Sequence, residues 1–329
     1  MRKQAIVLYV MLVIVLPMLL CSLVSITDQR KNNVNSIQES LEIRSYDTEE
    51  IIYVYDNGII LEIPLDEYVA GVVLAEMPAD FELEALKAQA VACRTFTLKS
   101  MQRSKHEDAY VCTDPACCQA FISSSEYEGS ISNLEKIYIA IKQTEDEILM
   151  FQGNLIEATY FSCSGGQTEA AAAVWGADVP YLQSVDSPGE EISSKYETTE
   201  SFSHTYFKQV LDLPQNMKLD ESNIKMTYTV GGGVDTLSIC DFSYSGVQVR
   251  SFLDLHSTIF DMIITNDSVL ITTKGYGHRV GMSQYGAEAM AVGGSSYDEI
   301  LLHYYLGTDL VKLSQEEMNE IFDKAANIL

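Results

Sequence analysis

The longest run of apolar positions lies at the amino terminus. Residues 5–24 carry no charge and are mostly Leu, Val, Ile and Met, and Arg2 and Lys3 precede them. About twenty apolar residues in a helix span the hydrocarbon core of a bilayer, and basic residues before the span favour a cytoplasmic amino terminus. The pattern predicts a single-pass anchor at residues 1–27. A cleaved signal peptide is the alternative, with an unusually long apolar region and no good cleavage site.

The segment after the anchor is polar. Residues 28–50 are rich in Asn, Gln, Ser and charged side chains and show little periodicity, which predicts a tether between membrane and folded body. Short apolar runs at residues 51–54 and 59–63 then flank Asn57-Gly58, an arrangement typical of a β-hairpin.

Two helices are predicted after the hairpin. Residues 65–75 have helical spacing of apolar positions, and Pro78 breaks the chain after them. Asp80 is a suitable N-cap for a second helix over residues 81–103. Glu82 and Glu84 lie in the first turn of this helix and Lys99 and Arg103 in its last turn, as the helix dipole favours.

The patterns that follow are weaker. Residues 137–149 predict a helix and residues 155–161 a strand. Residues 186–200 contain five acidic residues and a Ser-Pro-Gly sequence, which indicates an exposed linker. A capping-box pattern that begins at Ser314 predicts an amphipathic helix at the carboxyl terminus.

The central region has strand-like patterns. Residues 224–230, 247–253 and 262–273 alternate or run as strands do, and they predict a smaller β-rich lobe at residues 190–270. Taken with the helices, this predicts an α+β fold, with a membrane-anchored ectodomain in which the β-rich lobe is inserted into a mixed α/β lobe. The mixed lobe would comprise residues 51–189 and 271–329.

Composition limits the class of function. The 329-residue chain has 47 acidic and 21 basic residues, which gives a net charge of −26. This charge argues against a nucleic-acid-binding protein and against a protein held on an anionic membrane surface by basic residues. Hydrophobic residues make up 47% of the chain, which excludes a wholly disordered protein. Seven cysteines are too few for a disulfide scaffold of this length.

Glu76 occupies an unusual position for a carboxylate. It follows Leu65, Val69 and Val73 on the apolar stripe of the first helix. Burial disfavours the charged form of a carboxyl group and raises its pKa, and a general acid must be protonated near neutral pH. The alternative is an ordinary Glu at a helix end that faces solvent or pairs with a cation.

Two cations share one face of the second helix. Lys87 and Arg94 are seven residues apart, with Val91 and Leu98 on the same stripe. They can pair with Glu76 or bind an anionic group of a substrate. The alternative is that their stems are buried and their charged heads reach solvent.

Two glycine-rich segments suggest a ligand cleft. Residues 160–169 (YFSCSGGQTE) combine hydroxyl groups with two glycines, and residues 275–287 (GYGHRVGMSQYGA) contain four glycines and two tyrosines. Glycine allows close approach to the backbone, and hydroxyls and amides can hydrogen-bond a polyol. Neither segment matches a phosphate loop, a dinucleotide fingerprint or a serine-hydrolase elbow. Each segment alone is also compatible with a tight turn.

A His/Cys cluster follows the second helix. Imidazole and thiolate are preferred ligands of zinc, and four of them close a tetrahedral structural site. A disulfide from Cys112 to one of the two adjacent cysteines is the alternative in an outward-facing domain. The four candidate ligands are His106, Cys112, Cys117 and Cys118.

These blocks together resemble the stage II sporulation protein D family. The resemblance is carried by EYVAGVV at residues 67–73, EMP at residues 76–78 and EALKAQAVACRT at residues 84–95. It continues in residues 162–169, in Val174-Trp175 and in residues 275–287, so that it covers most of residues 50–310 in the family's order. Cys93, where Ala is usual, and Cys163, within the hydroxyl run, depart from the pattern.

The resemblance implies a peptidoglycan lytic transglycosylase that acts during engulfment in an endospore former. Such enzymes cleave between N-acetylmuramic acid and N-acetylglucosamine without water and leave a 1,6-anhydro product. The family's catalytic Glu corresponds to Glu76, and its Lys and Arg correspond to Lys87 and Arg94. The remaining candidate cleft residues are Tyr160, Ser164, Thr168, Glu169, His278, Gln284 and Tyr285.

The resemblance also implies a metal, partners and a location. Some clostridial members have a structural zinc cluster after the long helix, and Cys117 stands here at the place of a second His. The expected partners are glycan strands without stem peptides and stage II sporulation proteins P and M. The expected location is the mother-cell membrane, with the ectodomain outside the cytoplasm. A non-catalytic, wall-binding enhancer of a partner amidase and a structural zinc-bearing scaffold are the alternatives.

Overall fold

The computed structural model describes residues 31–36, 50–103 and 105–329. Over these residues the protein is a mixed α+β fold with several small sheets, as predicted. The predicted anchor at residues 1–27 and most of the predicted tether lie outside the described residues, although residues 31–36 are helical. Among the described segments, no helix has the length and apolarity needed to cross a bilayer.

The predicted hairpin is confirmed. Strands β1 (Ile51–Asp56) and β2 (Ile59–Pro64) pair antiparallel around Asn57 and Gly58. Both turn residues have positive φ, 46° and 95°, which a tight two-residue hairpin turn requires and which Asn and Gly tolerate best. Strand β3 (Val111–Cys112) pairs parallel with β1 and so carries Cys112 to the edge of the hairpin.

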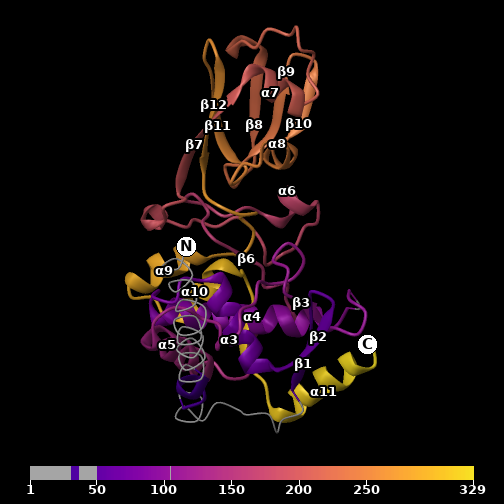
Figure 1. Ribbon diagram of the computed structural model, residues 1–329, viewed down its shortest axis with the longest axis vertical. Helices are drawn as coiled ribbons and strands as arrows, with labels where there is room; N and C mark the ends of the chain where they lie inside the picture. Colours follow the sequence, from indigo (N-terminus) through magenta and orange to yellow (C-terminus); the bar gives the residue numbers. More distant parts are fainter. Residues whose placement is uncertain (1–30, 37–49, 104) are drawn as a thin grey trace, which may run out of the picture.

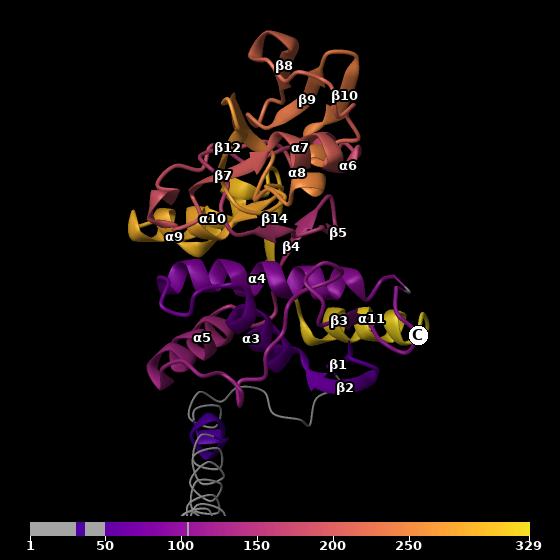
Figure 2. The ribbon, with the colours of Figure 1, turned by 45° about the horizontal axis from the view of Figure 1, so that its top comes forward.

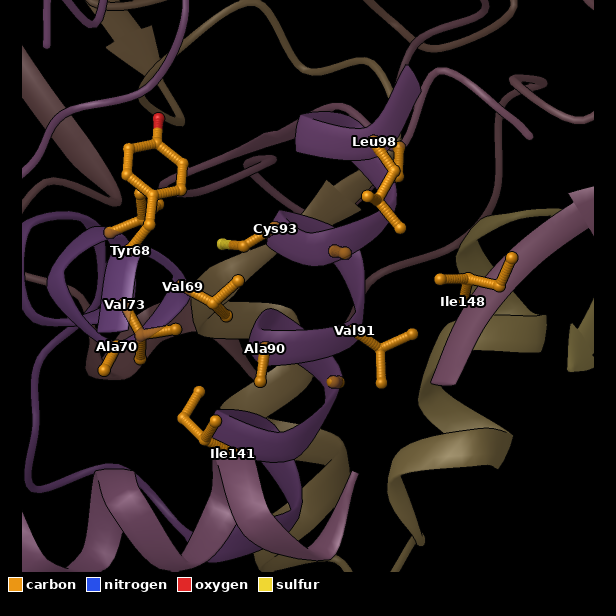
Figure 3. Packing of buried hydrophobic residues seen from close by; sticks show 14 of the residues in the cluster. Tyr68, Val69, Ala70, Val73, Ala90, Val91, Cys93, Leu98, Ile141 and Ile148 are labelled. Carbon is orange, nitrogen blue, oxygen red and sulfur yellow. The ribbon is translucent and has the colours of Figure 1, made fainter. Parts of the chain in front are cut away.

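Helix α4 (Leu83–Ser100) is the centre of the larger hydrophobic cluster. It follows α3 (Leu65–Glu76), and its N-cap is Glu82, so it is shorter at both ends than the predicted helix, and the assignment of Asp80 as N-cap is wrong. Figure 3 shows side chains of α3 directed toward α4, where small residues such as Ala90 allow close packing. Figure 2 shows α4 between α3 and α5 on one side and β4, β5, α9 and α10 on the other.

The middle segment differs from the prediction. The predicted helix at residues 137–149 is instead α5 (Ile131–Gln143), which Ser130 caps by accepting a bond from Asn133 N, followed by strand β4 (Glu147–Phe151). The predicted single strand at residues 155–161 is two strands in different sheets. These are β5 (Asn154–Leu155), which pairs with β4, and β6 (Tyr160–Phe161), which pairs with β13 (Met282–Ser283).

A second hydrophobic cluster lies in the region between residues 207 and 271. Figure 1 shows its elements gathered at the end of the molecule opposite α3, α4 and α11. Its two three-stranded sheets have the orders β11-β12-β7 and β10-β9-β8. The strands are β7 (Glu197–Ser203), β8 (Ile224–Tyr228), β9 (Val234–Ile239), β10 (Phe242–Ser245), β11 (Ile259–Ile264) and β12 (Ser268–Lys274), with helices α7 (His204–Val210), α8 (Gly246–Leu253) and the short η3 (Glu221–Asn223). The division into lobes at residues 190–270 stays a prediction.

Three predictions in this region need correction. The predicted strand at residues 247–253 is helix α8, which opens with a capping box between Ser245 and Gln248. The predicted strand at residues 262–273 is the β11–β12 hairpin. Residues 186–200 are not an exposed linker throughout, because Glu190, in η2 (Glu190–Ile192), is fully buried.

The carboxyl-terminal segment of the chain packs in the larger hydrophobic cluster. The predicted terminal helix is confirmed as α11 (Gln315–Ala326), with the capping box between Ser314 and Glu317. Strand β14 (Asp309–Lys312) pairs antiparallel with β4 and joins the carboxyl-terminal segment to the centre of the chain. The remaining helices are α6 (Ala171–Trp175), α9 (Gln284–Val292) and α10 (Tyr297–Tyr304).

Candidate active site and metal centre

A cavity of about 420 Å³ opens where the two glycine-rich segments meet the end of α3. The parallel pairing of β6 with β13 explains this meeting, because Met282 lies opposite Tyr160 and Ser283 opposite Phe161. The predicted catalytic and cleft residues that line the cavity are Glu76, Tyr160, His278 and Gln284. Phe96, Gln119 and Tyr276 also line it, and the sequence analysis missed them.

Glu76 is the last residue of α3 and is half-buried in the cavity wall. Burial raises the pKa of its carboxyl group above the usual value, although the backbone N–H of Ala120 opposes this by donating a bond of 2.7 Å to Oε1. Glu76 is also the only carboxylate among the described residues that line this cavity. The site therefore has one proton-transfer group with the properties of a general acid.

Tyr160 and His278 form a neutral part of the cavity wall. The Tyr160 hydroxyl donates a bond of 2.9 Å to Oε1 of Gln119, and burial raises its pKa well above the usual value. Burial lowers the pKa of His278 to about 4, and Nδ1 of its ring accepts a bond from Val280 N. A neutral imidazole whose Nδ1 is an acceptor carries its proton on Nε2. The ring packs near the exposed ring of Trp175, with centroids 5.3 Å apart.

Gln284 and Tyr285 open helix α9. Gln284 is 4% exposed, and its side-chain Nε2 has no hydrogen-bond partner among the described residues. Tyr285 does not line the cavity. Its ring packs edge-on against Phe81 at 5.1 Å between centroids, and its backbone N–H donates to Ser162 O.

The hydroxyl-rich segment binds the protein's own Glu190. The carboxylate of Glu190 accepts bonds from the backbone N–H groups of Ser164 and Gly165 at 2.6 and 3.0 Å. It also accepts from the hydroxyls of Ser164 and Ser187 at 2.8 and 2.5 Å. Ser164 is fully buried, so its hydroxyl positions a loop and does not face the cavity. The sequence analysis missed Glu190 because it lies in a segment with the composition of a linker.

Thr168 and Glu169 are also buried behind the cavity. The Thr168 hydroxyl bridges the backbone of Val185, accepting from its N–H at 2.8 Å. Glu169 lies 3.8 Å from the buried guanidinium of Arg279 and accepts a bond from the Thr229 hydroxyl. Arg279 in turn donates to Ser164 O at 2.9 Å, so this pair fastens the two glycine-rich segments together.

In the described part of the chain, Lys87 and Arg94 form no hydrogen bond or ion pair with Glu76, and neither lines its cavity. Lys87 pairs with Glu84 at 2.6 Å on the same helix. Arg94 is fully buried, where it donates to Thr144 O at 2.8 Å and lies 3.4 Å from the Asp66 carboxylate. Arg94 therefore holds α4 against its neighbours, whereas the ion pair of Lys87 lies within α4.

The four predicted metal ligands lie together. The ligand atoms of His106, Cys112, Cys117 and Cys118 are all within 4.8 Å of one another, and the three cysteines are free. His106 Nε2 is 3.3 Å from Cys118 Sγ and 3.7 Å from Cys117 Sγ, and the sulfurs of Cys117 and Cys118 are 4.0 Å apart. A tetrahedral zinc ion with normal bond lengths needs about 3.6 Å between nitrogen and sulfur and about 3.8 Å between sulfurs. The cluster fits such an ion.

The His/Cys cluster borders the cavity that contains Glu76. Cys118 lines both this cavity and a second one of about 470 Å³, which also contacts Arg103, Lys105 and Trp175. Gln119 and Ala120 follow Cys118 directly and contact Tyr160 and Glu76. No periodic pattern in the sequence identifies Gln119. The signal that could have identified it is its position directly after Cys118, a predicted metal ligand.

Comparison with known proteins identifies the family. A family model described as "Stage II sporulation protein" matches residues 55–151. The chain is 40% identical over 270 residues to stage II sporulation protein D of Bacillus subtilis (strain 168). This alignment covers 79% of this chain and 78% of that protein. It is also 31% identical over 293 residues to the "Amidase enhancer" of the same organism, covering 73% of this chain and 40% of that protein. The resemblance seen in the sequence motifs is therefore confirmed, and the chain belongs to the stage II sporulation protein D family.

Proposed function

We propose that this protein is a lytic transglycosylase that cleaves peptidoglycan glycan strands between N-acetylmuramic acid and N-acetylglucosamine during sporulation. The observation that carries the proposal is the half-buried Glu76, the one carboxylate that the described residues place in a cavity walled by aromatic and amide side chains. Hydrolytic glycosidases normally use two carboxylates that flank the bond. A lytic enzyme needs one, because the sugar's own 6-hydroxyl replaces water.

The chemistry then runs through Glu76 in two steps. The protonated carboxyl group gives its proton to the glycosidic oxygen as the bond to the anomeric carbon of muramic acid breaks. The resulting carboxylate takes the proton of the 6-hydroxyl as that oxygen bonds to the same carbon. The products are a free 4-hydroxyl and a 1,6-anhydro-muramic end, and Glu76 is protonated again. Burial keeps the acid form available, which supports this assignment.

In this proposal the His/Cys cluster has a structural role beside the site of Glu76. A zinc ion held by His106, Cys112, Cys117 and Cys118 would have no open coordination position, so its part is structural. It would fix the loop that leads to Gln119 and Ala120, the residues that contact Tyr160 and Glu76.

Location and partners are also part of the proposal. The apolar segment behind Arg2 and Lys3 would anchor the chain in the mother-cell membrane, with stage II sporulation proteins P and M as partners and peptide-free glycan as substrate. Membrane fractions should then retain the full-length chain through alkaline washing, and a soluble species lacking the first two dozen residues would contradict the anchor.

A second candidate function is that of a non-catalytic, wall-binding enhancer of a partner amidase. The likeness to the protein named "Amidase enhancer" favours it. The two candidates differ in one test, the release of glycan fragments by this chain alone. Release with 1,6-anhydro ends supports the transglycosylase, and release that needs an added amidase supports the enhancer.

A further inference from the structure

The side-chain amide of Gln284 is a buried donor without a partner. It is 4% exposed, lines the cavity of Glu76, and its Nε2 makes no hydrogen bond with any described residue. Buried polar groups are nearly always paired, because an unpaired one has lost its bonds to water without a replacement. A donor kept in this state beside a catalytic carboxylate points to a partner that arrives with the substrate.

The other side-chain amide of the cavity wall, that of Gln119, has hydrogen-bond partners within the protein. It is 1% exposed in the same cavity wall, but its Nε2 donates to Thr97 Oγ1 at 3.0 Å and its Oε1 accepts from the Tyr160 hydroxyl at 2.9 Å. Gln284 is held at the first turn of α9, where Ser283 caps the helix by accepting from Gly286 N at 3.2 Å. The backbone there is fixed, and it offers Gln284 Nε2 no acceptor.

The surroundings limit what the acceptor can be. No Lys or Arg lines the cavity in the described part of the chain, and its one carboxylate is Glu76, so an anionic acceptor would lack a counter-charge. The aromatic residues Phe96, Tyr160 and Tyr276 give the wall apolar surface. A neutral carbonyl attached to a small apolar group fits these surroundings, and the acetamido group of an N-acetyl sugar has both parts.

We propose that Gln284 is a specificity-determining residue whose Nε2 donates a hydrogen bond to the acetamido carbonyl of an N-acetyl sugar bound beside Glu76. The proposal rests on the proposed function, because it takes glycan as the ligand of this cavity. A sugar with a 2-hydroxyl in place of the acetamido group has no carbonyl oxygen to accept from Gln284. The site therefore selects N-acetylated glycan.

The test is binding without turnover. Full-length protein in detergent carrying Glu76→Gln is titrated calorimetrically with tetra-N-acetylchitotetraose and with cellotetraose, which has the same linkage and no acetamido groups. We expect the N-acetylated sugar to bind more tightly. Adding Gln284→Met should weaken its binding by about 2- to 10-fold, as for one net hydrogen bond, and leave the binding of cellotetraose unchanged.

The unfolding temperature separates this role from a structural one. Gln284→Met removes an unpaired donor and keeps the length of the side chain, so it should not lower the unfolding temperature, whereas Gln119→Met breaks two bonds and should lower it. An equal loss of affinity for both sugars, no loss, a lowered unfolding temperature for Gln284→Met, or no binding of either sugar would overturn the inference. Analysis of cleavage products of the otherwise unmodified protein tests the proposed function separately.

Discussion

The backbone N–H of Ala120 donates a hydrogen bond of 2.7 Å to Oε1 of Glu76, and Ala120 lies two residues after Cys118 of the metal cluster. The candidate acid and the candidate metal site are therefore joined through three consecutive residues. The bond fixes the orientation of the carboxyl group, while burial raises its pKa more than the bond lowers it.

The first prediction concerns the metal. Protein purified under reducing conditions should contain about one equivalent of zinc, because four nitrogen and sulfur ligands lie at tetrahedral spacing. Cys112→Ser and Cys118→Ser should each lose the zinc and lower the unfolding temperature, because binding energy at such a site is folding energy. Elemental analysis and thermal unfolding measure both effects.

Cys240→Ser is the matched control for this prediction. Cys240 is exposed and lies outside the cluster, so the variant should keep its zinc and its unfolding temperature. Protein without zinc, and with Cys112 in a disulfide, would contradict the metal site and leave a disulfide as the better interpretation of the cluster.

The second prediction concerns Glu67 and pH. Burial raises the pKa of its carboxyl group from 4.5 to about 7, with the Asp66 charge adding to the shift and the Tyr138 hydroxyl opposing it. A carboxyl group whose folded pKa is raised contributes stability that is full below about pH 4.5 and is lost as pH rises through about 7. Wild-type protein should therefore lose stability between pH 5 and pH 8.

Glu67→Gln should remove this loss, because the amide stays neutral and can still accept from the Tyr138 hydroxyl. Thermal unfolding from pH 5 to pH 8 measures the difference, with the exposed Glu126→Gln as the control. Parallel pH profiles for the wild type and Glu67→Gln would show that Glu67 is ionised in the folded protein.

The third prediction separates structural from catalytic cations. Arg94→Met should lower the free energy of unfolding by about 2–4 kcal/mol, because it removes a buried charged donor to Thr144 O and the ion pair with Asp66. Lys87→Met removes a partly exposed pair with Glu84 and should cost about 1 kcal/mol or less. Denaturant titration gives both values. A large loss of kcat in Arg94→Met at full stability would instead assign Arg94 a role in the reaction.

Local signals in the sequence predicted the local structure well. Asn57-Gly58 required a tight turn, the stripe from Leu65 to Val73 required a helix, and the Ser314 capping box marked the start of the last helix. The strand prediction for residues 247–253 was wrong. Val and Phe in this segment fit a strand pattern, but the capping box of Ser245 and Gln248 stabilises a helix there. Local propensity does not show which cap will form.

The candidate site was predicted in part. Glu76 and the four His/Cys residues could be found because each is an unusual residue type for its position or spacing. Ser164, Thr168 and Glu169 are buried because of partners far along the chain, such as Glu190 and Arg279, and no local pattern reveals those pairings. The parallel pairing of β6 with β13, which builds the cavity, joins residues more than a hundred positions apart.

The fourth prediction concerns Glu76 itself. Glu76→Gln keeps the size of the side chain but cannot donate and accept the proton, so turnover should fall by about 10²–10⁴-fold. Thermal unfolding should show an intact fold, since the amide oxygen can still accept from Ala120 N. The rate of the wild type should fall as pH rises above the raised pKa of Glu76, because the acid form is then lost.

The most direct test of the account is mass spectrometry of peptide-free glycan strands after incubation with the purified full-length chain in detergent. The account predicts fragments that end in 1,6-anhydro-muramic acid, one water lighter than the products of hydrolysis, and their near absence with Glu76→Gln. Reducing-end muramic acid as the primary product, or undiminished cleavage by Glu76→Gln, would contradict it.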